Sequence, residues 1–332
     1  MKKVSLDDIS KELGVSKTLV SFVMNGRAKE KRISDEMAEK VLAKAKELGY
    51  KADYLARALR TGKSQTLGLI MADISNAFFS KLARSIENEA SKHGYNVIFG
   101  SSDEDFVKSG KLIEVFKNKK VDGLIICPTI GDRRHVLKLD KEKYPYVLVD
   151  RYFKDIKSNS VTVDNYRGSF EIVDKQIKDG RQNIAFVNFN VELINMEDRF
   201  RGYQDALKSN GYRFNEALVK NVSFKAIEEQ TSQVVEDLLA SNPKLDAIYF
   251  SNNQLAFLGI KYIMLNKKES LDKIHLASFD SYDVMSLMQV PISFGVQPID
   301  ELGRYAVQLI MKQINIKGTS LEQIILPMQY AP

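Results

Sequence analysis

Several polar and basic side chains gather at the start of a short predicted helix near the amino terminus. Ser16 can cap this helix, and Leu19, Val20 and Val23 form its apolar stripe. Because the stripe must face a core, the side chains outside it are free to meet a partner: Ser16, Lys17, Thr18, Ser21 and Phe22. Exposed side chains at the start of such a helix are suited to contact base edges in the major groove of DNA.

Three of these side chains have chemistry that fits particular bases. The Lys17 ammonium can donate to guanine O6 or N7, Thr18 offers a hydroxyl and a methyl group, and the Phe22 ring can lie against thymine methyls. Two alternatives stay open at this point. Lys17 could contact only a phosphate, and Phe22 could be an additional core aromatic.

Three short helices are predicted to position these residues. The first begins after Ser5, with Asp8 as a capping-box partner, and ends at Gly14. A turn of about three to four residues then leads to the helix after Ser16, which stops at Asn25-Gly26, and this spacing predicts a helix-turn-helix. A third helix from Ser34 to Gly49 would close a core with its apolar residues Met37, Val41, Leu42, Ala45 and Leu48.

The charge of the chain is concentrated in this amino-terminal segment. Residues 1–62 contain 14 Lys and Arg against 9 Asp and Glu, whereas the remaining residues contain 35 against 34. A basic module on a nearly neutral remainder indicates a nucleic-acid partner that is bound by one end of the protein.

Composition limits the class of protein. A chain of 332 residues with 44% hydrophobic and 28% charged residues is an ordinary globular protein, which excludes disordered, collagen-like and coiled-coil chains. Since one core rarely exceeds about 250–300 residues, at least two domains are expected. Cys127 is the single cysteine, so a disulfide within the chain and a cysteine-based zinc site are excluded.

The amino terminus and the hydropathy pattern predict a cytoplasmic protein with no membrane partner. Asp7 and Asp8 come before any apolar segment that could act as a signal peptide. No later stretch approaches the roughly 18 consecutive apolar residues that a membrane-spanning helix needs.

From Leu67 onward, apolar strands alternate with amphipathic helices. This pattern predicts parallel sheets covered by helices, with ligands bound at the carboxyl ends of the strands. The strands expected are Leu67–Ala72, Asn96–Phe99, Gly123–Cys127, Tyr146–Val149, Ile184–Val187, Ala247–Phe250 and Ile274–Ser278. The last part of the chain is expected to contain Ser293–Pro298, a helix through Ile314 and then Gln323–Leu326. The helices expected are Phe79–His93, Lys111–Asn118, Ser169–Asp179, Arg199–Ser209, Ala226–Ala240 and Gln254–Leu265. A polar stretch at Asp155–Thr162 separates two similar blocks, which we interpret as two α/β subdomains.

The sequence offers little support for catalysis or for a bound metal or cofactor. No glycine-rich loop follows a strand, and His93, His135 and His275 lack the spacing of metal ligands. Cys127 lies in an apolar run, where a buried hydrophobic residue is the simpler interpretation than a nucleophile. We expect no catalytic residue, no metal ligand and no cofactor.

A set of motifs in this order resembles the lactose-repressor/galactose-repressor family of bacterial transcription regulators. The segment from Val4 to Ser21 resembles the head of that family, and 54–59 (Tyr-Leu-Ala-Arg-Ala-Leu) its hinge helix. Other matching segments are Asn76-Ala77-Phe78-Phe79, Val149-Asp150-Arg151, Arg199-Phe200-Arg201-Gly202-Tyr203, Asn252-Asn253, Ser278-Phe279-Asp280 and Val296-Gln297-Pro298. Each motif is weak alone, but together they span nearly the whole chain.

The resemblance implies a domain arrangement. It comprises a helix-turn-helix DNA-binding domain at 1–50, a hinge helix and linker at 51–66, and an effector-binding and dimerisation domain at 67–332. That domain would resemble the periplasmic sugar receptors, with an N-subdomain of about 67–160 plus 294–326 and a C-subdomain of about 161–293. An exported receptor has the same body, but it needs a signal peptide and no basic head.

The resemblance also implies a function and two sets of site residues. The protein would be a homodimeric regulator, of the repressor type, that binds a pseudo-palindromic operator under control of a small effector, a sugar or sugar derivative; the alternative is a soluble sugar-binding receptor without a regulatory role. Leu59 would wedge into the minor groove from paired hinge helices. The candidate DNA-binding residues are Ser5, Ser16, Lys17, Thr18, Ser21, Phe22, Asn25, Arg57 and Leu59. The candidate ligand-binding residues are Asn76, Phe78, Phe79, Arg151, Arg199, Phe224, Asn252, Asp280 and Gln297, and Asp73 is a further candidate.

The chain departs from the family pattern at several positions. Ala52-Asp53 stands where a Pro-Asn pair usually precedes the hinge, and the loop Arg27–Arg32 is longer than usual. Phe22 replaces a polar base-reading side chain, and Asn253 occupies a position that is often Asp. These differences bear on the choice of operator and ligand, and the class is unaffected.

Overall fold

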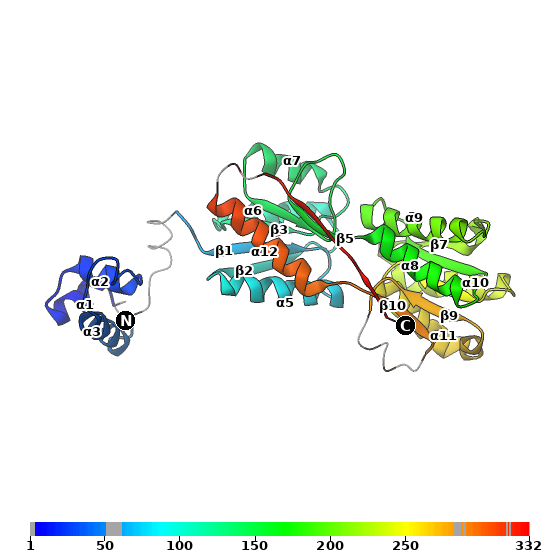
Figure 1. The fold of residues 1–332 in the computed structure, drawn as a ribbon, viewed down its shortest axis with the longest axis horizontal. Helices are drawn as coiled ribbons and strands as arrows, with labels where there is room; N and C mark the ends of the chain where they lie inside the picture. Colours follow the sequence, from blue (N-terminus) through cyan, green and yellow to red (C-terminus); the bar gives the residue numbers. More distant parts are fainter. Residues whose placement is uncertain are drawn as a thin grey trace. The chain divides into compact units, whose positions relative to one another are not determined.

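The computed structural model describes residues 4–50, 62–281, 284, 287, 290–316, 318 and 320–331. The chain divides after Ser64 into two compact units, which we call the head and the body (Figure 1). The expected hinge residues Arg57 and Leu59, and the departure at Ala52-Asp53, lie outside the described residues.

The head consists of the helices α1 (Leu6–Leu13), α2 (Lys17–Met24) and α3 (Asp35–Glu47). Each helix is preceded by an N-cap serine whose hydroxyl accepts a backbone N–H of the first turn, and α1 has the full capping box with Asp8. Gly14 ends α1 at a φ of 64°, a left-handed conformation that glycine adopts without strain. The buried core of the head is Ile9, Val20, Val23, Val41 and Ala45.

One residue of the predicted head core was assigned wrongly. The side chain of Leu42 is 50% exposed, because the inward stripe of α3 passes through Val41 and Ala45 and leaves Leu42 on the neighbouring outer row.

The body contains two sheets, each covered by helices on both faces (Figure 1). The first sheet has the order β11-β5-β4-β3-β1-β2, and all of its strands are parallel. Its strands are β1 (Thr66–Met71), β2 (Asn96–Ser101), β3 (Gly123–Ile126), β4 (Tyr146–Val149), β5 (Ser160–Val163) and β11 (Gln323–Leu326). Its helices are α5 (Ala77–Lys92), α6 (Phe106–Asn118), α7 (Arg133–Lys141) and α12 (Ile299–Asn315). We call this assembly the N-subdomain.

The alternation of side chains along β1 sorts the helices onto the two faces of the first sheet. Leu67 and Leu69 point into the core that α5 and α12 share, whereas Ile70 points into the core formed with α6 and α7. Gly68 also faces α6, since a Cβ at this position would lie 2.6 Å from the ring of Phe116. Both faces are therefore buried at the centre of the sheet, which is why β1, β3 and β4 are nearly continuous apolar runs.

The second sheet has the order β12-β10-β9-β8-β6-β7 and is parallel except for β12, which pairs antiparallel with β10. Its strands are β6 (Ile184–Phe189), β7 (Val219–Val222), β8 (Ala247–Phe250), β9 (His275–Ser278), β10 (Ile292–Val296) and β12 (Gln329–Ala331). Its covering helices are α8 (Asn165–Lys178), α9 (Ile194–Ser209), α10 (Ile227–Ser241) and α11 (Asn253–Asn266). The short 3-10 helices η1 (Glu216–Leu218), η2 (Phe224–Ala226) and η3 (Lys268–Asp272) lie between these elements. We call this assembly the C-subdomain.

The chain passes between the subdomains three times, after β5, after β10 and after β11. The observed sheets place two strands in a different subdomain from the one that the predicted limits gave. β10 belongs to the second sheet, although residues 294–326 were expected in the N-subdomain, and the whole of β5, which ends at Val163, belongs to the first. The helices α6, α8 and α9 also begin four or five residues earlier than expected. No described helix is both long and apolar enough to cross a membrane.

Candidate functional site

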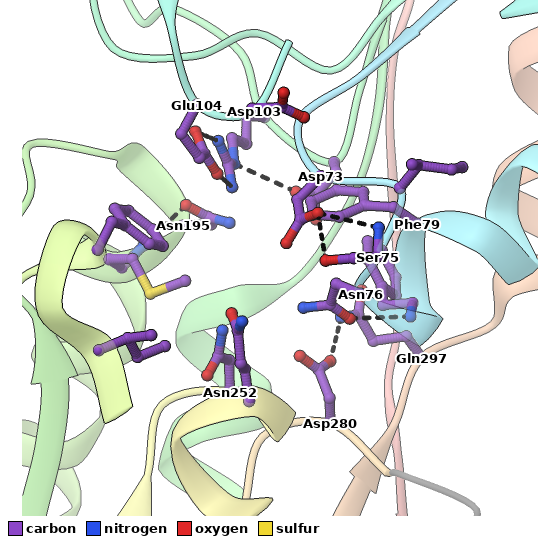
Figure 2. Close-up of a pocket in the computed structure, with 18 of the residues that line it drawn as sticks. Asp73, Ser75, Asn76, Phe79, Asp103, Glu104, Asn195, Asn252, Asp280 and Gln297 are labelled. Atoms are coloured by element: carbon purple, nitrogen blue, oxygen red, sulfur yellow. Dashed lines mark hydrogen bonds and ion pairs between the residues drawn. The ribbon is translucent and has the colours of Figure 1, made fainter. Parts of the chain in front are cut away.

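The body encloses a cavity of about 400 Å³ between its two subdomains, at the carboxyl ends of the strands (Figure 2). All nine candidate ligand residues line it, and so does Asp73. The N-subdomain contributes residues after β1, β2 and β4, and the C-subdomain contributes residues after β7, β8, β9 and β10 and from the first turns of α9. Lining residues that were not predicted are Ile74, Ser75, Asp103, Glu104, Asp150, Asn195, Met196, Ile227 and Gln254.

Arg199 is held in place by protein acceptors. Its Nε donates to Asn165 Oδ1 at 2.9 Å and its Nη1 to the Ser251 carbonyl at 2.6 Å, while its guanidinium lies 3.5 Å from the centre of the Phe279 ring. Only 2% of the residue is exposed. Burial lowers the pKa of Arg199, against the opposing effect of the Asp280 carboxylate 3.8 Å away. Arg199 is therefore part of the core as well as of the cavity wall.

Asp280 lies at the end of β9 and faces Arg199. Burial raises the pKa of Asp280, and Arg199 and Gln297 act in the opposite direction. The Gln297 amide nitrogen donates to Asp280 Oδ1, which fixes the orientation of that amide. Gln297 Oε1 is buried and has no partner among the described residues, so it is an acceptor available to a ligand hydroxyl.

The charge of Arg151 is balanced by an ion pair within the protein. Its Nη1 and Nη2 donate to the two carboxylate oxygens of Glu104 at 2.9 and 2.7 Å, and Nη1 also meets the Pro128 carbonyl at 3.2 Å. Burial tends to lower the pKa of Arg151, but the carboxylate of Glu104 outweighs it, so the pKa is raised and the side chain stays charged. Arg151 and Glu104 are 47 positions apart in the sequence, so no sequence pattern could predict that they form a pair.

Asp150 sits in a strained backbone conformation beside Arg151. Its φ of 68° lies in the left-handed region, which is uncommon for residues other than glycine and concentrates at functional sites. Burial raises the pKa of Asp150 even though Arg151 Nε lies 3.4 Å from its Oδ2. The position directly after the buried strand β4 was the signal in the sequence that could have found it.

Aromatic rings form the apolar walls of the cavity. Phe78 and Phe79 contact each other edge to face at 5.1 Å between ring centres, and Phe224 stacks on Phe189 at 3.9 Å. Phe78 and Phe79 are also members of the buried core. Asn252 caps α11 through its Oδ1, and Asn195 Oδ1 accepts the Met196 N–H. Because the side-chain oxygens of Asn252 and Asn195 accept these backbone N–H groups, their amide nitrogens are the atoms available to a ligand.

The head presents the predicted reading residues on and around α2. Ser5, Ser16, Lys17 and Thr18 are exposed, while Ser21, Phe22 and Asn25 are half-buried. Lys17 Nζ is paired with Asp7 Oδ2 at 2.9 Å, and both side chains are more than half exposed. Asn25 Nδ2 donates to the Ser21 carbonyl at 2.5 Å at the end of the helix.

Phe22 and the loop Arg27–Arg32 form one local cluster. Phe22 is absent from the head core, and Arg27 and Lys31 lie over its ring at 5.8 and 5.4 Å. Glu30 accepts two hydrogen bonds from Arg27, and this pairing lowers the pKa of Glu30 to about 2. The loop therefore carries an internal acid that neutralises one of its bases.

Comparisons with known proteins agree with this architecture. Residues 5–53 match the family of bacterial regulatory proteins of the lacI type, and residues 64–332 match the periplasmic binding proteins and sugar binding domain of the LacI family. Catabolite control protein A of Priestia megaterium is 30% identical over 326 residues, which cover 98% of this chain and 96% of that protein. The ribose operon repressor of Halalkalibacterium halodurans is 30% identical over 313 residues, 94% of this chain and 91% of the repressor.

Among solved structures, the lac repressor dimer bound to operator and the anti-inducer ONPF has a similar fold, with a TM-score of 0.85 at 19% identity, covering all of this chain and 98% of that one. A helix-turn-helix head on a ligand-binding body of two α/β subdomains defines a DNA-binding transcription regulator under ligand control. The chain belongs to the LacI family of bacterial regulatory proteins, as the resemblance predicted.

Proposed function

We propose that the protein is a homodimeric, cytoplasmic repressor whose effector is an uncharged sugar bound in the cavity between the two subdomains. The observation that carries the proposal is the composition of that cavity, which is lined both by aromatic rings and by buried carboxylate, amide and guanidinium groups. Aromatic faces suit the C–H surface of a sugar ring, and fixed polar groups suit its hydroxyls.

The state of the charged groups supports an uncharged ligand. Arg151 is already bonded twice to Glu104, and Arg199 is bonded to Asn165 and Ser251. The cavity also contains further carboxylates from Asp103, Asp150 and Asp280. A phosphate or carboxylate on the ligand would meet these acids without a guanidinium that is free of protein partners, so an acidic sugar is disfavoured.

In the head, we propose that Ser16, Lys17, Thr18, Ser21 and Phe22 contact bases, as the exposed start of α2 suggests. Lys17 would exchange its surface pair with Asp7 for a base or phosphate, an exchange that costs little because exposed ion pairs contribute about 0–1 kcal/mol. Ser5, Asn25, Arg57 and Leu59 remain proposed DNA contacts by family resemblance.

A binding protein is favoured over an enzyme. The Cys127 thiol is fully buried, its Sγ lies 3.7 Å from Asp150 Oδ2, and burial raises its pKa well above the usual value, so the thiolate needed for nucleophilic attack is disfavoured. Within the described residues, no group of three or more His, Cys, Asp and Glu side chains could hold a metal ion.

The DNA arm of the test selects duplexes from a random pool with the full-length protein. We expect a two-fold symmetric sequence whose affinity falls steeply as salt rises, because phosphate contacts release counterions. Lys17→Ala should change the selected sequence, whereas the matched control Lys40→Ala, on the exposed side of α3, should not. No duplex bound at low salt, with or without sugars, would contradict the DNA-binding assignment.

The ligand arm measures the melting temperature of the protein against neutral sugars, the corresponding sugar phosphates and uronic acids. A ligand that binds only the folded form raises the melting temperature, and we expect this from a neutral sugar. The same sugar should then change the affinity for the selected duplex, because the coupling between two sites is reciprocal. Stabilisation by phosphorylated or acidic sugars alone would overturn the proposed ligand class.

A further inference from the structure

Two buried asparagine side chains join the subdomains beside the cavity. Asn76 caps α5 in the N-subdomain, and Asn253 is the first residue of α11 in the C-subdomain. Asn76 Nδ2 donates to Asn253 Oδ1 at 3.1 Å, and Asn253 Nδ2 donates to Asn76 Oδ1 at 3.0 Å. Each amide therefore acts as both donor and acceptor toward the other, across 177 positions of sequence.

The cap of α5 fixes which way this pair can be assembled. Asn76 Oδ1 also accepts the Phe78 N–H at 3.0 Å, so reversing the Asn76 amide would remove the cap from α5. With that oxygen fixed, residue 253 must present one donor and one acceptor at the same time. An asparagine does so, whereas an ionised aspartate has acceptors only.

Asn253 is itself held firmly on the C-subdomain. Its backbone N–H donates to the Asp280 carboxylate, and the preceding residue, Asn252, caps α11. The pair thus connects the first turns of two helices whose neighbouring residues line the cavity, including Phe78, Phe79 and Asn252. Asn76 itself lines the cavity, whereas Asn253 is not among the described residues that line it.

A second side-chain link between the subdomains, among the residues that the structure describes, is weaker. Lys154 Nζ lies 3.5 Å from Glu197 Oε2, and both side chains are more than half exposed. Such an exposed pair contributes about 0–1 kcal/mol and is screened by salt. A buried and fully reciprocated amide pair is not screened in this way, since both partners are neutral and shielded from water.

We propose that Asn253 is a positioning residue that, by pairing with Asn76, holds the two subdomains closed around the cavity before any ligand binds. The inference goes beyond the proposed function, because it requires neither the identity of the ligand nor that of the operator. The closed arrangement then depends on the donor at position 253, and removal of that donor opens the body.

The test uses Asn253→Asp, because protonation of the new carboxyl group reverses its effect. When ionised, one carboxylate oxygen faces Asn76 Oδ1, and the two acceptors repel each other. When protonated, the group has one O–H donor and one carbonyl acceptor, which is the pattern of the amide that it replaces. Burial at position 253 disfavours the charged form of the new carboxyl group, and acidic buffer shifts the group toward its protonated form.

The readout is the distance between spin labels on cysteines that replace Lys141 of α7 and Lys208 of α9, two exposed residues on different subdomains. Cys127 is fully buried, and burial of this kind makes a thiol unreactive toward the label. Labelled chains are diluted into an excess of unlabelled chains, so that the distances arise within one chain. Circular dichroism confirms that each variant is folded.

We expect one short distance for the wild type and for the matched control Asn266→Asp, at the opposite end of α11, at both pH 8 and pH 5. Asn253→Asp should show a longer population at pH 8 that disappears at pH 5, and Asn253→Ala should show it at both pH values. The wild-type protein, measured at each pH, is the control for protonation of the other buried acids of the cavity, Asp150 and Asp280, whose pKa values are also raised by burial. It is also the control for any effect of Arg199, which lies beside Asp280.

Two results would overturn the proposal. One is an unchanged short distance in Asn253→Ala at both pH values, since that variant lacks any donor. The other is a longer population in Asn253→Asp that persists at pH 5. Neither outcome depends on whether a sugar or an operator is found, so failure here is distinct from failure of the proposed function.

Discussion

Replacement of Arg199 by methionine is expected to lower the free energy of unfolding of the body by about 3–5 kcal/mol. Methionine keeps the length of the side chain and some contact with Phe279, but it removes the charge and the donors. The Asn165 Oδ1 and Ser251 carbonyl acceptors, now bonded at 2.9 and 2.6 Å, lose their partner in a buried setting, at about 1–3 kcal/mol each. Asp280 loses its cation as well.

This loss should depend on pH in a defined direction. Burial already raises the pKa of Asp280, and Arg199 opposes that rise, so removal of Arg199 raises the pKa of Asp280 further. An acid whose pKa is higher in the folded than in the unfolded state destabilises the fold at high pH, and the penalty fades as pH falls through the folded-state pKa. The difference between Arg199→Met and wild type should therefore be largest at neutral pH and smaller in acid.

Urea denaturation followed by far-ultraviolet circular dichroism is the appropriate assay, because the chain contains no tryptophan. The double variant Arg199→Met/Asp280→Asn should regain part of the lost stability, since it removes the uncompensated carboxylate. A loss below about 1 kcal/mol, a loss that does not change with pH, or a double variant no more stable than the single one would refute the reasoning.

Two further predictions concern local packing. Ser5→Ala should destabilise the head by about 1 kcal/mol, because α1 loses the hydroxyl that accepts the Asp8 N–H and donates to the Asp8 carboxylate; faster hydrogen exchange within α1 is the measurement, and unchanged exchange contradicts it. Gly259→Ala should cost about 1–3 kcal/mol in urea unfolding, because the added Cβ would lie 2.4 Å from Phe250 Cζ; equal or greater stability would show that α11 can shift away from β8.

The sequence predicted those parts of the fold whose signal is local. Helices α1 to α3 begin directly after serines and have single apolar stripes, and strands such as β8 are short apolar runs buried on both faces. Strand β5 was not predicted because Ser160 and Thr162 are polar, although both side chains are buried within the sheet. The placement of β10 in the second sheet could not be foreseen, because strand pairing is decided by contacts far apart in the sequence.

The same distinction holds for the cavity. Resemblance located residues that stand within recognisable motifs, such as Asp280 and Gln297. It gave no sign that Glu104 neutralises Arg151, because that pair forms only when the loops after β2 and β4 meet. The resemblance also marked Asn253 as a departure from the family pattern, but it assigned no role to this residue. The contact of Asn253 with Asn76 forms only between the two subdomains and could not be seen in the sequence.

The threefold passage of the chain between the subdomains sets the order in which the protein can be completed during synthesis. The first sheet requires β11 at its edge, and one of its faces requires α12, yet both are translated after β6 to β10 of the second sheet. Proteins are synthesised from the amino terminus at about 5–20 residues per second, and domains generally fold as they emerge. The N-subdomain, though it begins first, therefore waits with the α12 face of β3, β4 and β5 uncovered until nearly the whole chain has left the ribosome.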